Sequence, residues 1–281
     1  MATSVAQVSP PAGRAATTQP AAARTPQKVR TADGRGYVRW QDRRGPAYPG
    51  DFWHSFGRDA KEIPLTMWDD TKAAASNPWT YVGLGAVAAT GISLAATDAD
   101  DRVAKHYRRE GGQLNGFWDT VGDVGGNPGT HFAITGAWYF ASLAANDVKG
   151  YETSKAALNA LAINGIVTMG LKGAARTHSP NGDPIGWPSG HASSSFCFAT
   201  VLAEAYGPWV GVPAFAFAAY VGYERIDARN HDFSDVVSGG LIGMAIGYAV
   251  AENHMPRVMG MDLIPYATPD GGAGLALYGR R

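Results

Sequence analysis

Apolar stretches of helical length, rich in glycine and alanine, recur along most of the chain. They lack the alternation of apolar and polar residues that is typical of strands, so the pattern predicts helices. The stretches long enough for core helices are residues 79–97, 130–146, 156–171, 192–206, 207–223 and 236–251. The sequence therefore predicts an all-α fold, a helical bundle of about six core helices.

The sequence leaves the environment of the bundle open. Most of the stretches are shorter than the roughly 20 residues that a helix needs to cross a bilayer, and Glu204 interrupts the fourth of them. Closely packed helices rich in small residues occur in membranes and in soluble bundles alike. We favour a membrane-embedded or membrane-associated bundle, with a soluble bundle as the alternative.

The segments before the bundle differ in character. Residues 1–35 have few large apolar side chains, so we expect them to be disordered. They also lack an apolar run behind a basic start, so we see no intact secretory signal in them. Residues 36–75 mix aromatic with charged residues and predict a short helix, a break at Pro64 and a second helix. These amphipathic helices fit a membrane interface and, equally well, packing on their own domain.

Two further segments complete the predicted organisation. Residues 76–255 form the helical core. In residues 256–281, two apolar runs flank Pro269-Asp270-Gly271-Gly272, which predicts a short C-terminal β-hairpin with a glycine turn.

Composition narrows the classes of function. Lys+Arg and Asp+Glu both number 24, so the formal net charge is zero and no nucleic-acid partner is indicated. The single Cys197 excludes an intrachain disulfide. It stands in an apolar run, which predicts a buried, unreactive thiol.

Candidate chemistry gathers in three polar clusters at the ends of predicted helices: 172–180, 187–195 and 224–235. In the second cluster, Pro188 suits the first turn of a helix. The N–H groups of Ser189, Gly190 and His191 would then lie at the positive end of the helix dipole, which favours an anion. His191 adds a proton source that titrates near neutral pH.

The third cluster supplies a nucleophile. His231 and Asp235 are four residues apart and would share one face of a helix. A carboxylate on one ring nitrogen fixes the tautomer and leaves the other nitrogen free to attack. Arg225 adds a bidentate donor for phosphate oxygens. Together the clusters predict phosphate chemistry with His231 as the attacking group.

Two of these runs resemble known signatures. Pro188-Ser189-Gly190-His191 is similar to the second signature of the type 2 phosphatidic acid phosphatase / vanadium haloperoxidase superfamily. Its third signature is similar to the run 225–235, in which five residues separate Arg225 from His231 and three residues separate His231 from Asp235. The resemblance covers roughly residues 156–251.

The first signature departs from the family pattern of a lysine, six residues and Arg-Pro. Counting from Lys172, the arginine position holds Ser179, followed by the expected Pro180. Arg176, one helical turn after Lys172, is our candidate for the missing guanidinium, and His178 is a weaker one. Glu224 replaces the serine that commonly precedes the arginine of the third signature, where it would either orient that arginine or repel a phosphate.

The resemblance implies a role for each matching residue. His231 would form a phosphohistidine and Asp235 would stabilise the imidazolium, while His191 would protonate the leaving group and then activate water. The phosphate would be held, without a metal ion or other cofactor, by Lys172, Arg176, Ser189, Gly190 and Arg225.

These roles imply a phosphatase acting on a phosphorylated lipid or a small phosphate ester, in a membrane and with its active site on the periplasmic, extracytoplasmic face. One alternative is a soluble, exported, periplasmic acid phosphatase of broad specificity. Because Ser179 stands in place of the arginine, a second alternative is a non-catalytic phosphate-binding or structural membrane protein.

Overall fold

The computed structural model describes residues 29–30, 36–37, 52–145, 147–254, 257–258, 261–267 and 273–278. The chain divides into two units, Met1–Arg44 and Gly45–Arg281. In the first unit, β1 (Val29–Arg30) pairs antiparallel with β2 (Gly36–Tyr37). Apart from β1, the segment predicted to be disordered lies outside the described residues.

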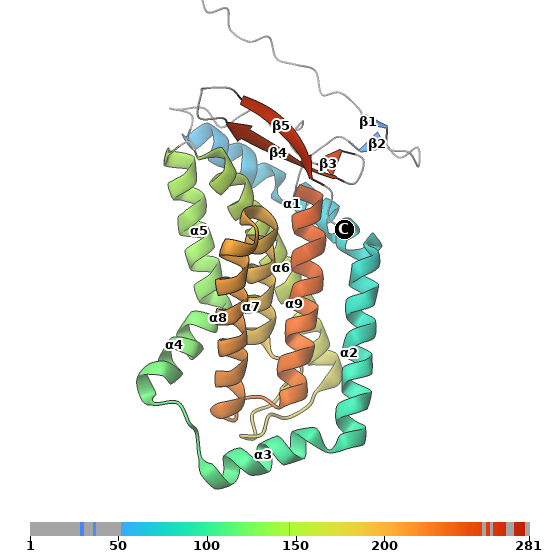
Figure 1. Ribbon diagram of the computed structural model, residues 1–281, viewed down its shortest axis with the longest axis vertical. Helices are drawn as coiled ribbons and strands as arrows, with labels where there is room; N and C mark the ends of the chain where they lie inside the picture. The colour runs from blue at the N-terminus through green and yellow to red at the C-terminus, as the bar shows by residue number, and fades with distance from the viewer. Residues whose placement is uncertain are drawn as a thin grey trace, which may run out of the picture. The chain divides into compact units, whose positions relative to one another are not determined.

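The described part of the second unit is overwhelmingly helical (Figure 1). Its helices are α1 (Phe52–Ser76), α2 (Pro78–Thr97), α3 (Ala99–Glu110), α4 (Gly116–Gly126), α5 (Pro128–Ala145), α6 (Val148–Ala175), α7 (Gly190–Tyr206), α8 (Pro208–Asp227) and α9 (Phe233–His254). The predicted all-α fold is confirmed, and the six predicted core stretches correspond to α2 and α5 to α9. The short helices α3 and α4 were not predicted.

Capping side chains set the first residue of several helices. The side chains of Asn77, Asn115, Asp147 and Ser189 each accept a backbone N–H from the first turn of the helix that follows. These contacts satisfy donors that have no partner inside a helix. The start of α7, which carries the second signature, is therefore fixed by Ser189.

Close packing of α7 against α9 aligns the two helices that carry the candidate histidines. Gly239, Gly243 and Gly247 are spaced by four residues on one face of α9. A Cβ atom on any of them would overlap the carbonyl oxygen of Ser189, Ser193 or Cys197, respectively. Only glycine permits this backbone approach. The N-terminal ends of α7 and α9 therefore lie side by side.

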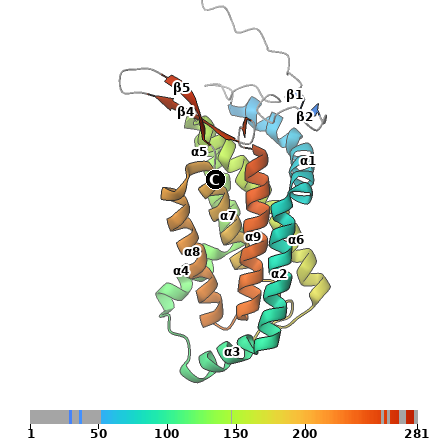
Figure 2. The ribbon, with the colours of Figure 1, turned by 45° about the vertical axis from the view of Figure 1, so that its right-hand side comes forward.

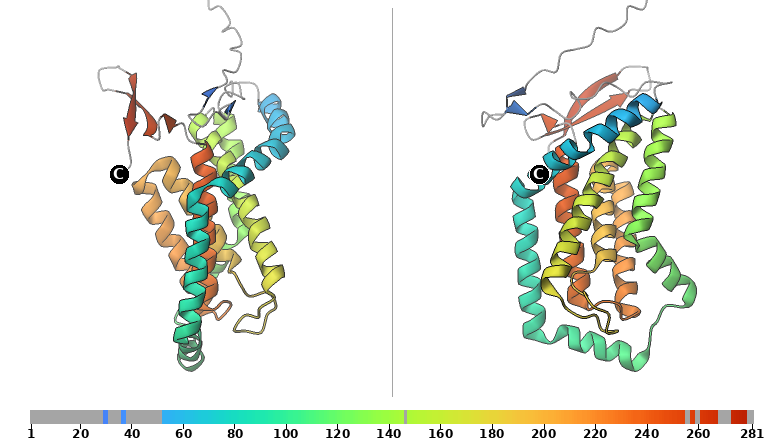
Figure 3. Two further views of the ribbon diagram at one scale, coloured as in Figure 1. Left: turned by 90° about the vertical axis from the view of Figure 1, so that its right-hand side faces the viewer. Right: turned by 180° about the vertical axis from the view of Figure 1, so that it is seen from behind.

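Helices α2 and α5 to α9 run up and down beside one another, as three further views show (Figures 2 and 3). The C-terminal ends of α6 and α8 and the N-terminal ends of α7 and α9 meet at one end of the bundle, where α3 crosses (Figure 1). We call this the α3 end of the bundle. The core between α6, α7 and α9 includes Leu161, Val201, Val250 and Cys197, whose thiol is fully buried as expected and has a pKa raised by burial.

The predicted break at Pro64 is wrong, because α1 continues through it from Phe52 to Ser76. Buried carboxylates hold the helix on both sides of the proline. Asp59 accepts hydrogen bonds from Tyr139 and Tyr151 and pairs with Lys155 at 2.7 Å. These tertiary contacts outweigh the local cost of proline in a helix.

The second anchor of α1 is Asp70, which is fully buried. It accepts hydrogen bonds from Asn159 and Asn253 and lies 2.9 Å from Nε2 of His254. Thus α1 presents a polar face to the bundle, whereas Trp53 and Leu65 on its outer side are exposed.

Among the described residues, α9 is long and apolar enough to cross a membrane, and the bent pair α2–α3 would be a second candidate. However, 61% of the apolar window of α9 is buried inside the bundle, as in the core helix of a soluble protein. Length and composition are thus compatible with membrane association and do not establish it.

In the C-terminal segment, β4 (Met261–Ala267) pairs antiparallel with β3 (Arg257–Val258) and with β5 (Ala273–Tyr278). The residues of the predicted glycine turn lie outside the described residues. The predicted hairpin therefore stays a prediction.

Candidate active site

His231 and Asp235 form a pair at the start of α9. Nδ1 of His231 lies 3.3 Å from Oδ2 of Asp235, and both side chains are nearly buried. The same oxygen accepts the backbone N–H of Asp232 at 3.0 Å, which holds the carboxylate in place. His231 precedes α9, so the pair is not within one helix as predicted, and Asp235 reaches back from the first turn. A proton on Nδ1 leaves the lone pair on Nε2.

Ser189 joins the start of α7 to that of α9. Its backbone N–H donates to the carbonyl oxygen of Asp235 at 3.0 Å, so this group is not available to an anion as predicted. Its hydroxyl oxygen accepts the N–H of Ala192 at 3.4 Å. The hydroxyl proton of Ser189 and the first-turn N–H groups of Gly190 and His191 are the donors left for an anion.

Arg225 is held by two carboxylates. Nε and NH2 each lie 2.5 Å from an oxygen of Glu224, which is fully buried, and NH1 lies 2.8 Å from Oδ1 of Asp123. The sequence left two roles open for Glu224, to orient Arg225 or to repel a phosphate, and the structure shows that it orients Arg225. The fork geometry fixes the plane of a guanidinium that is itself buried.

His191 lies on the other side of Asp123. Its Nε2 is 3.5 Å from Oδ1 of Asp123, is shielded from solvent and has no hydrogen-bond partner. Burial lowers the pKa of His191 to about 4, and the positive charge of Arg225 adds to this, whereas Asp123 opposes it. At neutral pH His191 is therefore uncharged, with a backbone hydrogen bond to Asp123 and with Nε2 able to accept a proton.

Lys172 lies at the end of α6, where its ammonium group donates to the carbonyl oxygens of Ile185 and Gly186 at 2.6 and 2.9 Å. Burial lowers its pKa, and the charge of Asp235 opposes this effect. Lys172 thus ties down the loop before α7 and lies within electrostatic reach of Asp235. Ser179, in the same loop, is buried.

Arg176 differs from the other predicted site residues. It is exposed, it ends α6 in the left-handed conformation, and its Nε donates to the carbonyl oxygen of Gly173. Its backbone N–H donates to the carbonyl oxygen of Lys172, but within the described part of the chain no hydrogen bond or ion pair joins its side chain to the cluster. The structure therefore brings together His231, Asp235, Ser189, His191, Arg225 and Lys172, and leaves Arg176 at the margin.

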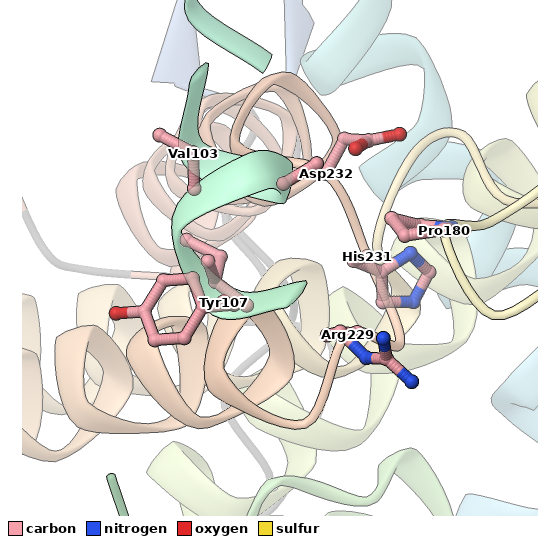
Figure 4. A pocket seen from close by; sticks show the side chains of 8 residues that line it. Val103, Tyr107, Pro180, Arg229, His231 and Asp232 are labelled. Carbon is pink, nitrogen blue, oxygen red and sulfur yellow. The ribbon is translucent and has the colours of Figure 1, made fainter. Parts of the chain in front are cut away.

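A small pocket beside His231 marks where α3 packs on the site. It is lined on one side by Val103 and Tyr107 of α3 and on the other by Pro180, Arg229 and His231 (Figure 4). Ala104, Ile226 and Asp232 complete the lining. Burial raises the pKa of Asp232 to about 6, helped by the negative charges of Asp235, Asp100 and Asp101. Helix α3 thus covers one flank of the candidate nucleophile.

Sequence reasoning missed Asp123, which belongs to no signature. The signal that could have found it is the glycine spacing in α4. A Cβ atom on Gly122 or Gly126 would overlap Glu224 or Val221, respectively, so α4 crosses α8 at close range. Asp123 stands between these glycines and is thereby carried to Arg225.

Comparisons with known proteins match the part of the chain that holds most of these residues. Residues 171–258 match the model of the PAP2 superfamily. This part of the chain is therefore similar to the PAP2 superfamily, which confirms the resemblance noted in the sequence. No solved structure matches the chain.

Two curated relatives are similar to part of the chain. A lipid A 1-phosphatase of Porphyromonas gingivalis is 31% identical over 94 residues, which cover 32% of this chain and 21% of the relative. A lipid A 4'-phosphatase of Helicobacter pylori is 29% identical over 128 residues, which cover 41% of this chain and 63% of the relative. The chain thus spans about a fifth and about three fifths of the lengths of these relatives.

Proposed function

We propose that this protein is a phosphatase that hydrolyses a phosphate ester or diphosphate of a lipid through a phosphohistidine intermediate, without a metal ion. The observation that carries the proposal is the convergence of two imidazoles and a carboxylate-clamped arginine at the α3 end of the bundle, which we call the catalytic end. Asp123 there contacts both Arg225 and His191, and the backbone N–H of His231 donates to the carbonyl oxygen of Arg225. The backbone N–H of Ser189 joins the start of α7 to Asp235. The match of residues 171–258 to the PAP2 superfamily and the two phosphatase relatives support it.

In the proposed first step, Nε2 of His231 attacks phosphorus and the phosphorus–oxygen bond to the leaving group breaks. The leaving alkoxide takes a proton from His191, and Asp235 stabilises the imidazolium of the phosphohistidine. The incoming phosphate anion raises the proton affinity of His191, which is low in the free protein.

In the second step, neutral His191 takes a proton from water, whose oxygen attacks phosphorus and releases inorganic phosphate. Arg225, Ser189, Gly190 and Lys172 hold the equatorial oxygens. Arg176, one turn from Lys172, is proposed to approach the phosphate when substrate is bound, in place of the arginine absent at Ser179.

The test is phosphate release from a panel of phosphatidate, isoprenyl diphosphate, lipid A-type phosphates and an aryl phosphate. We expect release by wild type in the presence of a chelator and a loss of several orders of magnitude for His231→Ala. Equal activity of His231→Ala and wild type would rule the mechanism out.

The lipid substrate implies a membrane location, with the catalytic end on the extracytoplasmic face. Exposed apolar side chains such as Trp79, Leu84 and Ile92 on α2 support contact with a bilayer. The buried character of α9 favours the second candidate, a soluble, exported phosphatase of broad specificity. Extraction without detergent separates them, because only the soluble protein enters the aqueous fraction. Hydrolysis of an impermeant substrate by intact cells tests the face.

A further inference from the structure

Next to the candidate site, α4 and α8 carry a set of apolar and aromatic side chains, most of which are exposed. We call this set the α4–α8 aromatic face, and it consists of Phe117, Trp118, Val124, Phe217, Tyr220 and Tyr223. Phe117, Trp118 and Val124 on α4 are 68%, 50% and 53% exposed. Phe217 and Tyr223 on α8 are each 39% exposed. Gathered apolar surface of this kind is costly in water and marks a binding surface.

The same two helices carry the polar groups of the site. On α8, Tyr220 and Phe217 precede Glu224 by four and seven residues, so all three share one face. At about 1.5 Å per residue, the face passes from the charged site to aromatic rings within about 10 Å. On α4, Trp118 precedes Gly122 by four residues and shares its face, and a Cβ atom on Gly122 would overlap Glu224. Asp123, whose side chain is 53% exposed, follows Gly122 at the edge of the site. The polar site and the apolar face are therefore continuous.

The aromatic face is held in place by the fold. The hydroxyl of Tyr220 donates to the carbonyl oxygen of Trp118, and the two rings lie edge to face at 6.3 Å. Gly125 lets α4 approach the ring of Phe217, where a Cβ atom would come within 2.7 Å. A surface fixed in this way binds a ligand with little further loss of entropy.

We propose that the α4–α8 aromatic face binds the apolar chain of the lipid phosphate whose phosphate lies against Arg225. The inference rests on the proposed function and names the part of that site that selects lipid substrates. The change from charged to apolar surface within two helical turns matches an amphiphile with its phosphate at one end. The chain leaves the site past Asp123 and lies across Trp118 and Phe217.

The experiment compares dioleoyl phosphatidate in detergent micelles with dibutyryl phosphatidate in solution, because these share a headgroup and differ in chain length. For full-length Trp118→Ala, we expect kcat/KM to fall on the order of tenfold with the long-chain substrate and to stay within about twofold with the short one. The backbone contacts of Trp118 with Asn115 and Tyr220 survive this change. Trp118→Phe should restore most of the loss, and Val124→Ser provides an independent second variant.

Trp209→Ala is the matched control, because Trp209 is 92% exposed at the far end of α8, about 24 Å along the helix from Arg225. An equal loss in this control would overturn the subsite in favour of general contact with the micelle. Equal losses on both substrates for Trp118→Ala, or none, would also overturn it. If wild type hydrolysed only the short-chain substrate, the proposed subsite would be wrong, whereas the proposed phosphatase activity would be supported. If it hydrolysed neither, the proposed function would fail as well.

Discussion

The NH1 atom of Arg225 lies 2.8 Å from Oδ1 of Asp123, and this oxygen also lies 3.5 Å from Nε2 of His191. A carboxylate oxygen between a guanidinium and an imidazole stands where a phosphate oxygen would bind, and it carries the same sign of charge. The side chain of Asp123 is about half exposed. We infer that the carboxylate of Asp123 competes with the substrate phosphate for Arg225. It also raises the pKa of His191, the proposed proton donor.

The first prediction concerns the pH dependence of Asp123→Asn. The charge of Asp123 opposes the effects that lower the pKa of His191, so its removal lowers that pKa further below about 4. Because His191 must carry a proton to assist the leaving group, the limb of kcat/KM that falls with rising pH should move to lower pH. We expect a shift of less than about one unit, because solvent screens a half-exposed charge.

Asp119→Asn is the control for this change, because Asp119 lies one turn earlier on α4. Product inhibition is a second readout: orthophosphate should bind Asp123→Asn several-fold more tightly, since a competing anion is gone. A shift to higher pH, or weaker binding of orthophosphate, would contradict the role of Asp123.

The second prediction concerns Glu224→Gln. Glu224 is fully buried and binds two nitrogens of Arg225. Its replacement by glutamine leaves the buried guanidinium paired with one carboxylate, that of Asp123, in place of two. Breaking such a pair costs about 3 kcal/mol, and we expect a lower melting temperature together with a fall in kcat/KM on the order of 100-fold. Thermal unfolding and steady-state kinetics measure the two effects. Unchanged kinetics would show that the plane of Arg225 is not set by Glu224.

The third prediction concerns Arg176→Ala. The side chain is exposed, so its removal should leave the melting temperature unchanged. If Arg176 approaches the substrate phosphate as proposed, KM should rise several-fold with a smaller change in kcat. Kinetics on the substrate panel measure this. A variant that matches wild type would show that nothing replaces the arginine absent at Ser179.

The fourth prediction concerns the anchor of α1. Burial would raise the pKa of Asp59, but the charge of Lys155 and the hydrogen bonds from Lys155, Tyr151 and Tyr139 outweigh it and lower the pKa. A lowered pKa in the folded state stabilises the protein above the ordinary value near 4, and the gain is lost as the pH falls through the folded value. Asp59→Asn should therefore lower the melting temperature by about 5–10 °C at pH 7, and by less below pH 4.

Asp69→Asn is the matched control on the same helix, because the ion pair of Asp69 with Lys72 lies near the surface and contributes little. A difference between Asp59→Asn and wild type that stayed constant from pH 7 to pH 3 would exclude the charge of Asp59 as its source.

Local sequence could predict the core helices and the His231–Asp235 pair, because apolar periodicity and short-range spacing are properties of the chain itself. The continuity of α1 through Pro64 could not be predicted in this way, since Asp59 and Asp70 hold it through residues far away in the sequence. The contact of Asp123 with Arg225 depends likewise on how α4 crosses α8. The hydrogen bond from the backbone N–H of Ser189 to the carbonyl oxygen of Asp235 depends on how α7 packs on α9.

The most direct test of the central claim is to trap the phosphorylated protein. Wild type, His231→Ala and His191→Ala are mixed with an aryl phosphate labelled at phosphorus and quenched under alkaline conditions, in which phosphohistidine survives. Because an aryl leaving group needs little proton donation, we expect label to accumulate in His191→Ala, to be transient in wild type and to be absent from His231→Ala. Label retained by His231→Ala would contradict the account.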